Sequence, residues 1–94
     1  MAAQPTESKF PLGRLVATPH ALETLNADDV RTAIGRHAAG DWGDLCEEDL
    51  EANRFALDEG LRVLSAYEDR AGVKFWIITE ADRSATTVLL PDDY

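Results

Sequence analysis

Residues 73–80, VKFWIITE, decide the fold of this chain. Their β-branched and aromatic side chains alternate with a period of two, which is the pattern of a β-strand. One face of that strand carries Phe75 and Ile77, and the other carries Trp76 and Ile78. Because both faces are apolar, we expect a central strand that helices cover on at least one side.

Two further segments flank this strand at short distances along the chain. Residues 61–67 alternate in the same way, and residues 85–90 are rich in Thr and Val before Pro91 ends the pattern. The segments that connect these strands are short and polar, as turns are. The sequence therefore predicts a C-terminal, three-stranded antiparallel β-meander, and residues 12–17 are a candidate fourth strand.

The region before the meander predicts helices. Thr18 followed by Pro19 is typical of an N-cap and a first helical position, and it predicts a short helix over 19–25. Apolar residues spaced by three and four predict a second helix over 28–39, which ends at Gly40.

A third helix is predicted over 45–59, because Asp44 and Glu47 fit a capping box at its start. Together these patterns predict an α+β fold, in which two to three N-terminal helices pack on the meander. We expect residues 1–9 to form a flexible tail and residues 10–94 to form a single domain.

The formal charge of −9 is concentrated in one part of the chain. Residues 41–59 contain eight acidic residues and one basic residue, Arg54. A nucleic-acid-binding protein carries a basic surface, so this charge argues against direct binding to DNA or RNA. It favours a protein partner whose own surface is basic.

Other patterns narrow the choice of compartment and cofactor. No apolar run approaches the ~20 residues of a membrane span, and no signal peptide is evident, so we expect a cytoplasmic protein without membrane contact. Cys46 is the only cysteine, which excludes an intramolecular disulfide, and we expect it to be a packed side chain. No metal motif is present, so no metal or other cofactor is predicted. A monomer and a homodimer are both compatible with this sequence.

His37 is the best-placed candidate base, because it lies near the C-terminal end of a predicted helix. Asp41 could orient it as the partner of an acid–base pair. The alternative interpretation is a histidine that caps helix carbonyls and packs on Trp42.

A phosphate pocket is a second possible use of the same histidine. His37, Arg62 and Arg83 could form a small cationic pocket, with Ser84 or Thr86 assisting. If the face that carries Arg62 is covered, its guanidinium must be paired, and we expect Asp41 or Glu80 to be the partner.

An interaction surface is the other interpretation of the polar residues. It would combine the loop over 40–44, the start of the third helix, and the charged turn over 80–84. Its expected contact residues are Asp41, Trp42, Asp44, Glu47, Glu48, Glu80, Asp82 and Arg83. In the purely structural alternative, this loop and this turn brace one another.

Several strings of this sequence resemble a known protein family. They are GDWGDL at 40–45, ITEADRS at 78–84 and TTVLLP at 86–91, followed by Tyr94. They resemble a family of small, uncharacterised bacterial proteins that are described as plasmid-related. The resemblance covers residues 15–94 and implies a bacterial, intracellular origin. It implies no activity, and no catalytic residue is inferred from it.

We therefore expect a small acidic bacterial accessory protein that acts as a non-enzymatic protein-interaction module. One form of this hypothesis is an anti-CRISPR or anti-restriction inhibitor that imitates the charge of nucleic acid. The alternative is a small ribonuclease or phosphodiesterase that uses His37, Arg62 and Arg83. That alternative rests on a fold-level likeness to small toxin ribonucleases, which hold RNA on a basic face.

Overall fold

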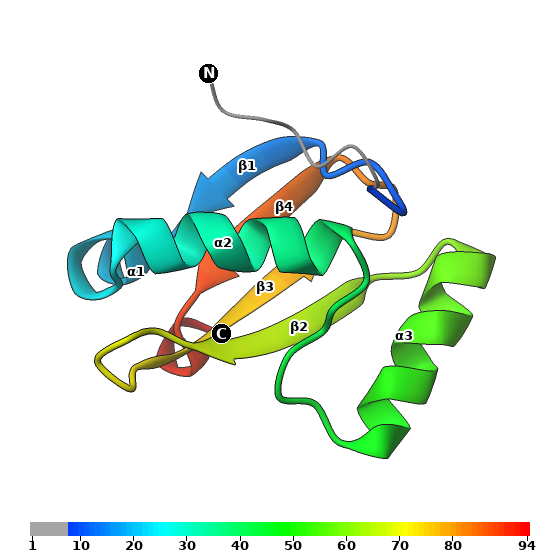
Figure 1. Cartoon of the computed structure of the whole chain (residues 1–94). Coiled ribbons are helices and arrows are strands. Elements are labelled where there is room, and N and C mark those ends of the chain that lie inside the picture. The colour runs from blue at the N-terminus through cyan, green and yellow to red at the C-terminus, as the bar shows by residue number, and fades with distance from the viewer. Residues whose placement is uncertain (1–7) are drawn as a thin grey trace.

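The computed structural model describes residues 8–94, so most of the predicted tail lies outside the described residues. Its elements follow the order β1, α1, α2, α3, β2, β3, β4 and η1 (Figure 1). The strands are β1 (Arg14–Ala17), β2 (Val63–Glu68), β3 (Lys74–Thr79) and β4 (Ala85–Leu89). The helices are α1 (Pro19–Thr24), α2 (Ala27–Ala38), α3 (Glu47–Glu59) and the 3-10 turn η1 (Pro91–Asp93). The predicted α+β fold is confirmed.

One four-stranded sheet has the order β1-β4-β3-β2. The pairs β2–β3 and β3–β4 are antiparallel and form the predicted meander. The candidate fourth strand is present as β1, and it pairs with β4 in parallel. The central strand is β3, as its two apolar faces predicted, and it lies between β2 and β4.

One face of the sheet is covered by α1 and α2 (Figure 1). Ala21 and Ala33 from these helices pack on Phe75, Ile77 and Val88 from the sheet, and all five side chains are buried. Trp76 stands on the opposite face and is only half-buried, although its apolar ring would also suit a core. There its ring contacts that of Tyr94, with 5.7 Å between the two centroids.

Helix α3 lies beside the sheet rather than across it (Figure 1). Its apolar side packs with Val63, Phe10 and Trp42 in a second, smaller core cluster. Asn53 accepts a hydrogen bond from the Leu64 N–H and donates one to the Leu64 carbonyl. These two bonds attach α3 to the outer edge of β2, and they satisfy backbone groups that an edge strand otherwise leaves open.

The start of α3 differs from the prediction. Cys46 is the N-cap, no side chain caps the helix, and the capping box expected from Asp44 and Glu47 is wrong. The Asp44 N–H donates instead to the Ala66 carbonyl, which draws the loop onto β2. Cys46 is exposed, which corrects the expectation of a packed thiol. Among residues 8–94, no helix has the length and apolar content that crossing a bilayer requires.

Candidate functional site

His37 lies at the centre of a buried chain of hydrogen bonds. Its Nδ1 is 2.6 Å from Ser65 Oγ, and its Nε2 is 2.8 Å from Thr79 Oγ1. Thr79 Oγ1 is in turn 2.7 Å from Thr86 Oγ1, whose hydroxyl donates to the Leu12 carbonyl. All four side chains have no exposed area. The predicted base is therefore a core residue, and no substrate reaches it while this core is intact.

The direction of these bonds fixes the tautomer of His37. A carbonyl only accepts, so Thr86 uses its proton on Leu12. Thr79 must then donate to Thr86, which leaves Thr79 as the acceptor of the His37 Nε2–H. Nδ1 of the neutral ring is consequently the acceptor, and Ser65 donates to it.

Burial, and after it the positive charge of Arg83, lowers the pKa of His37 from 6.5 to about 4. The imidazole is therefore neutral at physiological pH. A general base at neutral pH needs a pKa near that pH and a path to the reacting proton, and His37 has neither. This environment favours the structural interpretation of His37.

Trp42 is buried beside this histidine. Its ring stacks on Phe10 at 6.0 Å between centroids and meets the His37 ring edge-on at 5.4 Å. Only 7% of Trp42 is exposed. The indole thus holds the loop over 40–44 on the domain, and it does not present the exposed ring that its place among the expected contact residues would require.

Asp41 does not pair with His37. Its carboxylate accepts two hydrogen bonds from the Arg36 guanidinium, at 2.7 and 3.2 Å, and these bonds lower the pKa of Asp41. Arg36 also lies over the Tyr67 ring, 4.9 Å from its centroid. The acid–base pair expected from His37 and Asp41 is therefore absent.

Arg83 braces three segments of backbone. Its guanidinium donates to the carbonyls of Leu61, Glu80 and Ala56 at 2.6, 3.1 and 3.3 Å. Its backbone has a φ of 61°, in the region that favours glycine. All these acceptors are protein carbonyls, so the guanidinium serves the end of α3 and the turn before β4.

Arg62 and Ser84, the other members of the predicted phosphate pocket, bind to local partners and not to His37. Arg62 donates to Tyr94 Oη at 3.0 Å and lies 3.5 Å from the Glu80 carboxylate, on the exposed side of the sheet. Glu80 was one of the two partners expected for Arg62. The Ser84 N–H donates to Asp82 at 3.0 Å, as in a local turn. The described residues therefore do not form the pocket expected from His37, Arg62 and Arg83.

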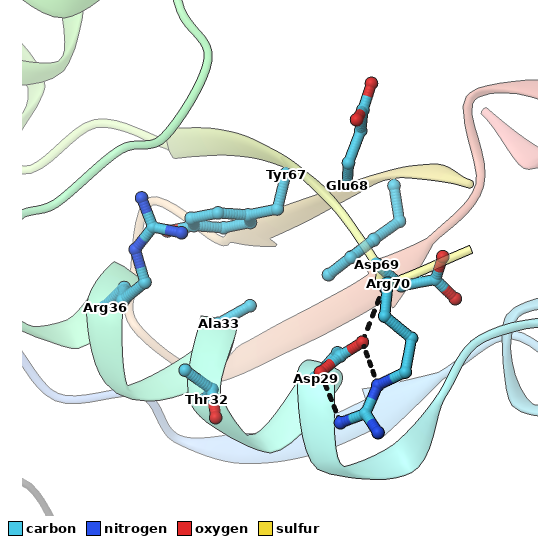
Figure 2. Close-up of a pocket in the computed structure, with 9 residues that line it drawn as sticks. Asp29, Thr32, Ala33, Arg36, Tyr67, Glu68, Asp69 and Arg70 are labelled. Carbon is cyan, nitrogen blue, oxygen red and sulfur yellow. Dashed lines mark hydrogen bonds and ion pairs between the residues drawn. The ribbon is translucent and has the colours of Figure 1, made fainter. Parts of the chain in front are cut away.

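A shallow pocket that the sequence did not indicate lies between α2 and the end of β2 (Figure 2). Its volume is about 250 Å³, and Tyr67 and Phe75 form part of its wall. Arg36 and Arg70 border it, but each is already paired, with Asp41 and Asp29 respectively. Because both guanidinium groups are already paired, and the other charged side chains of the lining are carboxylates, this pocket offers no unpaired cation to an anionic ligand.

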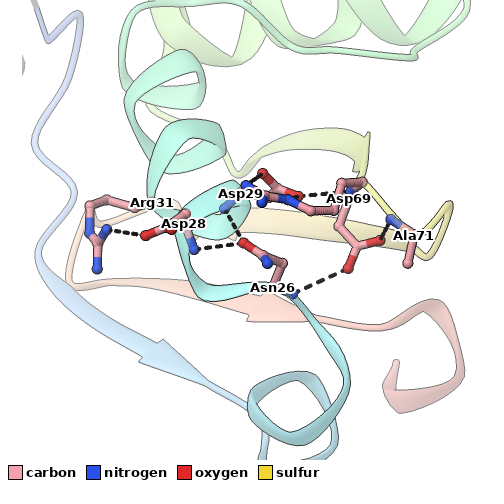
Figure 3. A network of polar contacts seen from close by, with 7 residues as sticks. Asn26, Asp28, Asp29, Arg31, Asp69 and Ala71 are labelled. Atoms are coloured by element: carbon pink, nitrogen blue, oxygen red, sulfur yellow. Dashed lines mark hydrogen bonds and ion pairs between the residues drawn. The ribbon is translucent and has the colours of Figure 1, made fainter.

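Next to this pocket, Asp69 connects the loop before α2 to the β2–β3 turn (Figure 3). It accepts from the backbone N–H groups of Asn26, Ala71 and Val73, at 3.2, 2.9 and 3.0 Å. These bonds lower the pKa of Asp69, and the bond from Val73 has the largest effect. The network is structural, and only its Asp-Arg-Ala-Gly turn composition hinted at it in the sequence.

The acidic side of α3 is the remaining candidate. Asp44, Glu47 and Glu48 are exposed, as the interaction hypothesis requires. Phe55 of this helix is apolar, yet 59% of it is exposed. Helical spacing places Phe55 on one face with four exposed acids, which are Glu48, Glu51, Asp58 and Glu59. We refer to these five residues as the α3 acidic face.

Within residues 8–94, no cluster of three or more His, Cys, Asp or Glu side chains could hold a metal ion. Comparisons with protein-family models, curated proteins and solved structures give no match to this chain. The assignment of function therefore rests on the geometry of the site alone.

Proposed function

We propose that this chain is a non-enzymatic interaction module whose α3 acidic face binds a partner protein with a basic surface. The observation that carries the proposal is the exposed Phe55 ring, which lies among four carboxylates on one side of a helix. A phenylalanine that is 59% exposed leaves most of its ring area in water, so a partner that covers it would gain the burial that the fold does not use. Aromatic residues are enriched in interface cores, where a partner covers them.

The surrounding carboxylates define the chemistry of that partner. Glu48, Glu51, Asp58 and Glu59 border the ring, and none of them has a salt bridge within the described part of the chain. Exposed charges of one sign steer a partner of the opposite sign and increase the association rate at low salt. Lysine and arginine side chains around an apolar contact would therefore match this face.

The attachment of α3 keeps this face outward. Asn53 binds the backbone of Leu64 on the opposite side of the helix, and Ala56 is buried against the domain. A fixed orientation lowers the conformational entropy lost on binding, because the helix is already formed and placed.

A nucleic-acid-binding groove is one basic surface that this face could occupy. We propose, as the narrower form of the function, that the partner is a bacterial defence nuclease or CRISPR complex, whose groove would take the carboxylates in place of phosphates. The charge of −9 supports this form. The burial of His37 and the local pairing of Arg62 and Arg83 do not favour the ribonuclease alternative.

The test is affinity capture with the purified full chain from a bacterial lysate at low and high salt. We expect the wild type to retain a basic protein at low salt and to release it as salt rises, because screening weakens exposed charge pairs. Phe55→Ser should reduce retention at least tenfold. The variant with Glu48→Gln and Glu51→Gln should reduce both retention and its dependence on salt.

The matched control changes two exposed acids elsewhere, Glu23→Gln and Glu68→Gln. It removes the same two negative charges as the variant with Glu48→Gln and Glu51→Gln. If both charge variants lose the partner to the same extent, binding reflects net charge alone and the proposed face is wrong. Addition of duplex DNA tests the narrower form. DNA should displace the chain if the partner's groove is the site, and retention unchanged by excess DNA would contradict that form.

A further inference from the structure

Strand β1 has an open outer edge. It is the terminal strand of the sheet, and its other edge is bonded to β4 (Figure 1). The N–H groups of Arg14 and Thr18 donate to the Ser84 and Val88 carbonyls. Because alternate residues of a strand direct their backbone groups to opposite edges, the N–H and C=O groups of Leu15 and Ala17 point outward. No strand among the described residues pairs with them.

The opposite end of the sheet is protected in a way that β1 is not. The outer edge of β2 is bonded to Asn53 and to the loop backbone at Trp42 and Asp44. An exposed edge of unpaired backbone groups is a template for another strand. Of the two edge strands that the structure describes, β1 is therefore the one to which another strand can be added.

Apolar side chains surround this open edge. Leu15 is 54% exposed, Val16 40% and Leu22 of the adjacent α1 72%. Beside them lies an open hollow of about 110 Å³, which is lined by residues with apolar side chains that include Ala17, Leu22 and Leu25. An apolar side chain placed in this hollow would be removed from water, which is favourable.

We propose that two copies of this chain pair through β1, antiparallel, about a two-fold axis at Val16. The bonded pairs would be Leu15 with Ala17 of the second copy and Ala17 with Leu15 of the second copy. Each such pair exchanges two backbone hydrogen bonds, so the outward groups of both strands are satisfied. The two sheets then become one continuous sheet of eight strands.

The side chains fit this register. Leu15 and Ala17 lie on the face that α1 and α2 cover, since their partners in β4 are Thr86 and the core residue Val88. Leu15 of one copy comes opposite Ala17 of the other, at the hollow that Ala17 lines. The second copy thus supplies the group that fills the cavity, and the cavity is incomplete without it.

Charge favours a second copy at this edge. Residues 13–22 contain no carboxylate, in a chain with a net charge of −9, so two copies can approach here without direct repulsion between acids. The register also places Arg14 of one copy opposite Thr18 of the other. The Thr18 hydroxyl donates to the Asp93 carboxylate at 2.7 Å, so Arg14 meets an acid on each side of the axis.

The first test is sedimentation of the full chain from micromolar to millimolar concentration. We expect a dimer at the higher concentrations, and we expect Leu15→Lys to shift its dissociation constant upward at least tenfold. Leu61→Ser is the matched control, because it removes an exposed apolar side chain beside β2, at the other end of the sheet from β1, and should leave the dimer unchanged. A chain that stays monomeric, or a dimer that Leu61→Ser abolishes, would overturn the proposal.

The second test reads the register and does not depend on the Leu15→Lys variant. Val16 faces its own copy across the axis at about 4.5 Å between Cα atoms, which a disulfide can span. In a Cys46→Ser background, Val16→Cys should form a disulfide-linked dimer on mild oxidation. Leu15→Cys should not, because the two positions lie about 7–8 Å apart on the diagonal. Leu15 is the more exposed of the two, so equal cross-linking of both variants would indicate random collision and overturn the proposed pairing.

Discussion

His37 Nε2 donates to Thr79 Oγ1 across 2.8 Å, and this bond joins α2 to the central strand β3 inside the core. Both side chains are fully buried, and Ser65 satisfies the remaining ring nitrogen. A buried polar chain of this kind is favourable only while every member has its partner. Its members therefore make stability sensitive to pH and to substitution.

The first prediction concerns pH. The pKa of His37 is lowered from 6.5 to about 4 in the folded protein, so the unfolded chain binds a proton over this interval and the native state does not. The contribution of His37 to the free energy of unfolding should therefore fall as pH decreases from about 6.5 to about 4, by about 1.4 kcal/mol per unit at most, and level off below. This amounts to about 3 kcal/mol from this one group.

The measurement is urea denaturation of the wild type and His37→Gln at several pH values. Glutamine offers one donor and one acceptor but does not titrate, so the difference between the two curves isolates the histidine. The two proteins should converge as pH decreases through this interval. Parallel curves would show that the pKa of His37 in the folded state is close to its ordinary value.

The second prediction concerns Arg83. Arg83→Met keeps an aliphatic side chain over Phe10 but removes the guanidinium from the Leu61, Glu80 and Ala56 carbonyls. The Glu80 and Ala56 carbonyls keep backbone donors, the N–H groups of Arg83 and Leu61, so the Leu61 carbonyl is the one that loses its donor. We expect a loss of about 1–3 kcal/mol in the free energy of unfolding. Arg31→Met is the control, because within residues 8–94 Arg31 pairs only with exposed Asp28, and its loss should change stability by less than about 0.5 kcal/mol. Equal losses in both variants would show that the guanidinium of Arg83 does not brace the backbone.

The third prediction concerns the attachment of α3. Asn53→Ala removes both bonds to Leu64, and we expect faster amide exchange in α3 together with a loss of about 1–3 kcal/mol. Arg54→Ala changes an exposed neighbour on the same helix and should have little effect. Unchanged exchange in Asn53→Ala would mean that the apolar contacts of α3 alone hold it in place.

Local patterns predicted the elements of this fold well. The alternation in residues 73–80 identified the central strand, and Thr18 and Pro19 marked the start of α1 as observed. These signals are local, because a strand or a cap is specified by residues that are neighbours in the chain. The parallel pairing of β1 with β4 was not predicted, since it joins segments about 70 positions apart without a turn between them.

The site was harder to predict, because burial depends on tertiary contacts. The sequence offered His37 as a candidate base and Trp42 as a contact residue, yet both side chains lie in the core. Phe55 is apolar and yet exposed, because the inner side of α3 is already occupied by Leu50, Asn53 and Ala56. Helical spacing around Asn53 could have placed Phe55 outward, had the amide been recognised as a buried bond to the sheet.

The last prediction contrasts two glycines of the same chain. Gly43 has a φ of +74°, and a Cβ there would lie 2.0 Å from the Ala66 carbonyl oxygen, on the backbone of β2. Gly35 lies within α2, and a Cβ there would meet nothing within 4 Å. Gly43→Ala must therefore push the loop off β2, and we expect a loss of about 2–4 kcal/mol or failure to fold. Gly35→Ala should stabilise by about 0.5–1 kcal/mol, because alanine loses less backbone entropy in a helix. Thermal denaturation of both variants measures this, and a stable Gly43→Ala protein would contradict the close approach of the loop to β2.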